Sequence, residues 1–241
     1  SASSDAITLA NDGTCTANLS NRQNRNLIIN GAMQVAQRGT SSTTNGYGSV
    51  DRFAVDSSGT DEAPTHAQVD LTSSDTGPYE SGFRKALKIT NGNQTSGAGS
   101  SDYIEIRHRI EAQDIANSGW NYTNTNSKIT LSFWVKSSIA QNFYGYIRTR
   151  DGTAQNFCIE TGSLSQNTWT KVTKTIPGNA NLQFDTDTTT NAADKGLEIY
   201  FTLFMGTDLT NNKSLNSWAG FDGTNHSPDQ TPTWYTTNDA T

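Results

Sequence analysis

Strict alternation of apolar and polar residues is the feature that most constrains how this chain can fold. It recurs in segments that we expect to be strands: residues 86–90, 103–110, 129–136, 143–150, 169–176 and 197–205. Residues 51–55 and 65–71 are two further expected strands. Successive side chains of a strand point to opposite faces of its sheet, so a period of two predicts half-buried strands. A single short helical turn is expected at residues 111–117. The sequence therefore predicts an all-β, two-sheet antiparallel β-sandwich of the jelly-roll kind.

The chain divides into two unequal parts. Residues 1–25 hold too few apolar side chains for a core of their own, so we expect an extended N-terminal arm or connector. Residues 26–241 form the predicted jelly-roll domain, and residues 26–30 are its first expected strand. Only 32% of the residues are hydrophobic, but only 17% are charged, whereas disordered chains combine low hydrophobicity with high net charge. The abundant Thr, Asn and Ser suit strands and turns instead.

Charge and cysteine content exclude several classes of protein. The net charge is -6 and no basic cluster is evident, so nucleic acid is not an expected partner. No apolar run is long enough to cross a membrane, so membrane insertion is not expected either. Cys15 and Cys158 lie far apart and form no CxxC motif, which predicts two free thiols rather than a zinc site.

The outer faces of the predicted strands carry the candidate ligand-binding residues. Tyr144, Tyr146, Arg148 and Arg150 alternate along one strand and form a row on its outer side. Aromatic rings stack on sugars, and the planar guanidinium of Arg offers a fork of donors for hydroxyls or carboxylates. The full candidate set is Tyr144, Tyr146, Arg148, Arg150, Trp134, Tyr103 and Arg107. Alternatively, the row packs against another subunit or against the arm, since exposed aromatic patches often mark interfaces.

The same alternation assigns the aromatic residues of the strand at 197–205. Leu197, Ile199, Phe201 and Leu203 are expected to face the core. Tyr200 and Phe204 are expected on the outer side of the sheet.

No catalytic or metal-binding motif is present. His66, His108 and His226 lie outside any recognisable motif, and there is no G-x-S-x-G elbow, P-loop or G-x-G-x-x-G. We therefore expect no enzymatic activity and no cofactor. Asp185, Asp187 and Asp194 could offer oxygen ligands to calcium, but their spacing does not match an EF-hand loop. A solvated acidic loop is the expected structure there, and no metal site is predicted.

Residues 26–40, Asn-Leu-Ile-Ile-Asn-Gly-Ala-Met-Gln-Val-Ala-Gln-Arg-Gly-Thr, resemble the opening of a family of phage virion proteins. These are tail-fibre and related receptor-recognition proteins of tailed bacteriophages. Val50 to Phe53 fits the same pattern, as do residues 129–136 and 169–175. The resemblance covers about residues 26–241 and is specific chiefly at 26–53. The rest is a generic jelly-roll pattern that is also similar to carbohydrate-binding modules.

The resemblance implies a jelly roll on a virion fibre, usually a homotrimer, with other virion subunits and a host cell-surface glycan as its partners. It implies either attachment to the host or a purely structural role as a tail, fibre-linker or capsid-decorating protein. The resemblance does not identify any individual binding residue of this chain. In such proteins the jelly roll usually closes with a further strand after a segment like Thr233 to Tyr235, so the last strand is expected to be missing or supplied by another chain.

Overall fold

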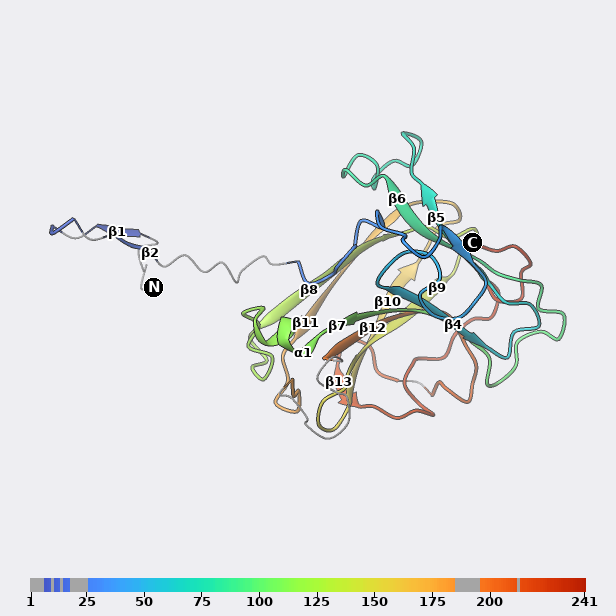
Figure 1. Ribbon diagram of the computed structural model, residues 1–241. Coiled ribbons are helices and arrows are strands. Elements are labelled where there is room, and N and C mark those ends of the chain that lie inside the picture. The colour runs from blue at the N-terminus through green and yellow to red at the C-terminus, as the bar shows by residue number, and fades with distance from the viewer. Residues whose placement is uncertain (1–6, 10, 14, 18–25, 185–195, 212) are drawn as a thin grey trace.

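The computed structural model describes residues 7–9, 11–13, 15–17, 26–184, 196–211 and 213–241. The elements in chain order are β1 (Ile7–Leu9), β2 (Cys15–Ala17), β3 (Ser41–Ser42), β4 (Phe53–Ser58), β5 (Thr65–Asp70), β6 (Lys85–Thr90), β7 (Tyr103–Ile110), α1 (Ala112–Ala116), β8 (Lys128–Val135), β9 (Asn142–Thr149), β10 (Gln155–Ser163), β11 (Thr170–Pro177), β12 (Leu197–Met205) and β13 (Trp218–Gly220) (Figure 1). The all-β prediction and the short helical turn at 111–117 are both confirmed.

One layer is a six-stranded antiparallel sheet in the order β13-β10-β9-β12-β7-β4. The long strands β7, β9 and β12 lie side by side at its centre, and their register is set residue by residue. Tyr200 of β12 stands between Arg107 of β7 and Tyr146 of β9. This register fixes which side chains meet on each face of the sheet.

The opposing layer consists of two smaller sheets, β11-β8 and β3-β5-β6. The inward side chains of β8 and β11 meet those of β9, β10 and β12 in one apolar cluster, which includes Leu131, Ile147 and Ile176. A second cluster joins β6 to the other end of the large sheet through Ile89, Ile104 and Phe143. The inward faces predicted from alternation are thus the faces that form the core of a β-sandwich.

The segment expected as the first strand is not a strand, and that prediction is wrong. Residues 26–28 are irregular and residues 29–32 are turns. Asn30 has a left-handed φ of 58°, and its side chain bonds the backbone of Val35 in both directions and the carbonyl of Asp51. Short polar side chains that bond nearby backbone compete with strand pairing, so the apolar run does not extend into a sheet. Ile29 is left 47% exposed.

Phe204 also departs from the expected face. The pairing of β12 with β7 shifts register between Thr202 and Phe204, which marks a bulge or irregularity in the strand. An extra residue in one strand moves the following side chains to the opposite face. Phe204 therefore enters the core and stacks on Tyr235, with ring centroids 4.4 Å apart.

The C-terminal residues join the two small sheets at the point where β6 and β8 end. Trp234 and Tyr235 are buried in the second apolar cluster. The backbone N–H of Asn91, just after β6, donates to the carbonyl of Ala240, and that of Ser138, after β8, donates to Thr241. In Figure 1 the C-terminus accordingly lies beside β5 and β6. Where β6 and β8 end, the described C-terminal residues thus contribute buried aromatic side chains and not a further strand.

Residues 7–17 were expected to belong to an extended arm. Within the described part of that arm, β1 pairs antiparallel with β2, with Thr8 opposite Thr16. The two strands form a sheet of their own. No helix among the described residues is long and apolar enough to cross a membrane.

Candidate functional site

The outer face of the six-stranded sheet carries three rows of polar and aromatic side chains that run across its strands. Successive residues of each row come from neighbouring strands in register. The first row is Asp56, Glu105, Thr202, Tyr144 and Glu160, the second is Ala54, Arg107, Tyr200, Tyr146 and Cys158, and the third is Arg109, Glu198, Arg148 and Asn156. The face predicted from alternation is therefore real, and the register brings its side chains together.

The chain itself covers part of this face. Leu209, Leu215 and Phe221 pack on a third apolar cluster that contains Tyr146 and Tyr200. They belong to a covering segment that consists of residues 206–211, 213–217 and 221–230, on either side of the edge strand β13, and that is drawn as red loops in Figure 1. The amide of Asn156 fixes this covering segment by donating to the carbonyl of His226 at 2.7 Å.

A pocket of about 280 Å³ remains between the sheet face and the covering segment. Its floor comes from the central strands β7, β9 and β12, and its far wall from residues 221–226. The lining residues are Tyr103, Glu105, Tyr146, Arg148, Tyr200, Met205, Phe221, Gly223 and His226. Aromatic rings, one cation and one carboxyl group thus meet in a single cavity, on strands whose backbone is held on both sides.

Two tyrosine rings form the centre of the floor. Tyr146 stacks on Tyr200 with centroids 4.4 Å apart, and His226 meets Tyr146 edge-on at 5.1 Å. Burial raises the pKa of both tyrosine hydroxyls and lowers the pKa of His226, so all three groups are neutral at pH 7. The floor is therefore a flat, uncharged aromatic surface.

Glu105 reaches the pocket beside these rings. It accepts a hydrogen bond from the Tyr146 hydroxyl at 3.2 Å, and it lies beside the carboxylate of Asp56. Burial is the main cause that raises its pKa from 4.5 to about 7, and Tyr146 only partly opposes that shift. A carboxyl group in this state is a proton donor below neutral pH and an acceptor above it.

Glu198 is fully buried and bonded from three sides. Arg109 and Arg150 each donate through Nε, and the Tyr200 hydroxyl donates at 2.7 Å. Burial alone would raise the pKa of Glu198, but these donors outweigh it and lower the pKa. Arg107 forms an ion pair with Asp56, with its Nη2 3.1 Å from Asp56 Oδ2. These ion pairs hold the strands of the face together.

Arg148 differs from these arginines. Its guanidinium lies 3.5 Å from the centroid of the Phe221 ring, and among the described residues it forms no ion pair. Burial, and then the neighbouring charge of Arg150, lower its pKa. Its Nε is buried without a hydrogen-bond partner within the described part of the chain.

The structure groups some of the predicted site residues and separates others. Tyr103, Tyr146 and Arg148 line the pocket. Tyr144, Arg107 and Arg150 lie on the same face of the sheet but do not line the pocket. Trp134 does not join them, because β8 belongs to the opposite layer. Its ring lies against Gly77, where an added Cβ would come within 2.7 Å.

Several pocket residues were not in the predicted set. Glu105 and Tyr200 share the alternating outer face with Tyr103 and Tyr146, so the same pattern could have found them. Phe221 and His226 could not have been found in this way. They lie in an irregular segment whose sequence carries no period that would place it on the sheet.

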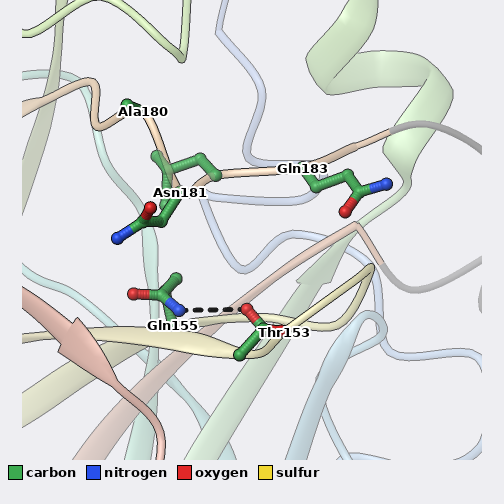
Figure 2. Close-up of a pocket in the computed structure, with 6 residues that line it drawn as sticks. Thr153, Gln155, Ala180, Asn181 and Gln183 are labelled. Carbon is green, nitrogen blue, oxygen red and sulfur yellow. Dashed lines mark hydrogen bonds between the residues drawn. The ribbon is translucent and has the colours of Figure 1, made fainter.

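A second, larger hollow of about 520 Å³ lies between the start of β10 and residues 180–183. Figure 2 shows Thr153 and Gln155 on the strand side, Asn181 across from them, and Gln183 directed away from Gln155. The Gln155 amide donates to the carbonyl oxygens of Thr153 and Ala154, so its donors already have partners. This lining has neither an aromatic ring nor a charge, which makes it the weaker candidate for a binding site.

The three histidines considered in the sequence are all buried inside the fold. His66 is buried between the Ser49 hydroxyl and the carbonyl of Thr44. His108 is buried on the core side of β7, and burial lowers its pKa to about 4. Among the described residues no three His, Cys, Asp or Glu side chains are grouped as metal ligands. Asp185, Asp187 and Asp194 lie outside the described residues.

Comparison with known proteins found a likeness to a solved structure. No protein-family model matches this chain, and no curated protein matches it. The fold is similar to the crystal structure of the enzymatically active domain of tailspike protein 4 from bacteriophage CBA120, at 13% sequence identity and a TM-score of 0.43. The match covers 73% of this chain and 19% of the tailspike chain. At this identity and TM-score, the likeness assigns no function.

Proposed function

We propose that this chain is a non-catalytic domain of a bacteriophage virion fibre that attaches to a glycan on the host cell surface. The observation that carries the proposal is the pocket of tyrosines, Arg148 and Glu105 on the outer face of the β-sandwich. Sugar-binding sites combine aromatic rings, which contact the apolar face of the sugar, with a few polar groups that bond its hydroxyls. The resemblance of residues 26–53 to phage receptor-recognition proteins supports the virion assignment.

A binding role accounts for the pocket better than a hydrolytic one. Glycoside hydrolysis in most families needs two carboxyl groups on either side of the scissile bond. Glu105 is the one carboxylate among the described residues that line the pocket. Glu198, two rows away on the same face, is fully buried with both oxygens bonded to arginines and is not accessible to a substrate.

The pocket is small, so we expect weak binding at each site. Presentation of the domain as a homotrimer on a fibre would raise the overall affinity, because the second and third contacts become intramolecular.

The test is a screen of the protein on an array of bacterial surface glycans, with two matched variants. Tyr103→Ala removes a ring that lines the pocket, whereas Tyr144→Ala removes a ring of the same sheet face that does not line it. We expect Tyr103→Ala to weaken binding at least several-fold and Tyr144→Ala to leave it unchanged. Absence of any bound glycan would refute the function, and loss of binding in Tyr144→Ala alone would refute the site.

A purely structural role in the virion is the second candidate, and the N-terminal hairpin favours it. β1 and β2 pair only with each other among the described strands. An isolated two-stranded hairpin is marginally stable in water, so a neighbouring subunit is its natural support. Deletion of residues 1–25 followed by measurement of the oligomeric state tests this role. An unchanged oligomer would exclude the hairpin as an assembly element.

A further inference from the structure

We propose that the pocket on the outer sheet face binds the carboxylate of an acidic saccharide, such as a uronic acid, and that Arg148 is the residue that binds it. This inference rests on the proposed function and names the class of glycan that the site selects. It follows from four observations: the state of Arg148, its orientation, the unsatisfied groups on its face of the sheet, and the neutral walls of the pocket.

Arg148 forms no ion pair within the described part of the chain. Glu198 stands directly opposite Arg148 in the register of β9 and β12 and would be its natural partner. Both oxygens of Glu198 are instead bonded to Arg109 and Arg150. A partly buried guanidinium without an anion is unfavourable, since burial of a charge costs free energy unless a partner is present. A ligand carboxylate would supply that partner.

Arg148 is also held in one orientation. Its guanidinium lies on the ring of Phe221, which covers one face of the fork, and its Nε has no hydrogen-bond partner among the described residues. The edge of a guanidinium is the part that forms two parallel hydrogen bonds with a carboxylate. A fixed fork loses less conformational entropy on binding than a mobile Arg or Lys side chain would.

Buried polar atoms without hydrogen-bond partners lie on the sheet face that carries Arg148. The Nε of Arg148, the Nε of Arg107 and the Oδ1 of Asn156 are buried without hydrogen-bond partners among the described residues. Asn156 of β10 stands opposite Arg148 of β9, and Arg107 lies on the same face two strands away, on β7 beyond β12. Nearly all buried polar atoms in native proteins are bonded, so such a group of exceptions indicates a place where a ligand or ordered water completes the bonding.

The remaining charged groups on the face do not exclude an anion. Asp56 is paired with Arg107, and Glu198 is paired with Arg109 and Arg150. On the covering segment, Asp222 is exposed and bonded to Thr224. Among the residues that line the pocket, Glu105 is the carboxyl group that could repel an acidic sugar, and its raised pKa of about 7 keeps it mostly protonated at pH 6.

The experiment compares two sugars that differ by one carboxylate. Methyl β-glucuronoside and methyl β-glucoside are titrated to 100 mM into the ¹⁵N-labelled protein at pH 6 and constant ionic strength, with sodium acetate as the plain carboxylate. The readout is the Nε–H resonance of Arg148, assigned by its loss in Arg148→Gln. We expect the glucuronoside to shift this resonance and to bind about tenfold or more tightly than the glucoside, as a charge-assisted pair predicts.

The variants separate the inference from a structural effect. Arg148→Gln should abolish the preference for the acidic sugar, and Arg148→Lys should keep part of it, because Lys retains the charge but not the fork. Arg38→Gln removes one positive charge at an exposed position and should leave the preference intact. Thermal unfolding of each variant identifies any that has lost its fold.

The outcomes distinguish this inference from the proposed function. Equal binding of both sugars, no binding of the glucuronoside, or a preference that survives Arg148→Gln would overturn the inference. An equal shift with acetate would show an anion site that does not select saccharides and would overturn it as well. If the array binds only neutral glycans through the pocket, the proposed function stands and the inference fails. If no glycan binds at all, both fail.

Discussion

Glu105→Gln should make the protein more stable than the parent chain at alkaline pH and should have little effect at acidic pH. Gln keeps the shape of the side chain and can still accept the hydrogen bond of the Tyr146 hydroxyl. It cannot ionise. The substitution therefore removes only the free-energy cost of a buried negative charge.

The size of this cost follows from the pKa. Burial raises the pKa of Glu105 from 4.5 to about 7 in the folded protein. Each factor of ten in a proton equilibrium is worth about 1.4 kcal/mol, so ionised Glu105 lowers the free energy of unfolding by about 3 kcal/mol. Because the folded pKa is the higher one, the folded state retains a proton that the unfolded state has lost. Stability is thus full below about pH 4.5, falls as the pH rises to about 7, and stays low above it.

The assay is urea unfolding, followed by tryptophan fluorescence at one ionic strength between pH 4 and pH 8. The quantity of interest is the unfolding free energy of Glu105→Gln minus that of the parent, because other titrating groups then cancel. We expect this difference to grow by about 3 kcal/mol between pH 4 and pH 8. Glu80→Gln, at an exposed position, serves as the control for the loss of a carboxylate. A difference that stays constant with pH, or falls, would refute the buried, proton-retaining state of Glu105.

Other consequences of the structure can be measured directly. Gly77→Ala should destabilise the fold by about 1–3 kcal/mol more than Gly82→Ala in denaturant unfolding, because both have φ near +95° but only Gly77 faces a ring, that of Trp134. Asn91→Ala should cost about 1–3 kcal/mol and speed proteolysis at the C-terminus, since its amide bonds three carbonyl oxygens of the C-terminal segment. Burial raises the pKa of the Cys158 thiol to about 12, so mass spectrometry should find its peptide alkylated at pH 8 only after unfolding. Three results would contradict the packing described: an Asn91→Ala variant as stable as the parent, equal stabilities of the two glycine variants, or rapid alkylation of Cys158 in the folded protein.

The sequence predicted best those strands that have one buried and one polar face. β7 and β12 were predicted with their observed bounds, because period two is visible wherever one face meets the core. β10 was missed for the opposite reason. Its residues from Gln155 to Ile159 are buried on both faces, and its polar side chains bond within the protein instead of facing water. No alternation remains in such a strand, so pattern alone cannot identify it.

Local side-chain bonding explains the other failure. The apolar run at 26–30 has the composition of a strand, yet Asn26 and Asn30 bond the backbone of residues close to them in sequence. A sequence pattern registers the hydrophobicity of Leu27 and Ile28, which do pack on the core. It does not register the competition between a side-chain amide and a neighbouring strand for the same backbone groups.

The candidate site shows where prediction from alternation stops. Period two placed the aromatic and arginine side chains on the outer sheet face, but it could not show that Leu209, Leu215 and Phe221, from the loops around β13, pack over them. A solvated platform could leave its charges to water, whereas a covered face must pair them, since burial of a charge without a partner costs several kcal/mol. Glu198 meets this requirement with two arginines and a tyrosine. Arg148 has no ion pair within the described chain, and this difference between two residues opposite each other in register is the observation on which the proposed binding site rests.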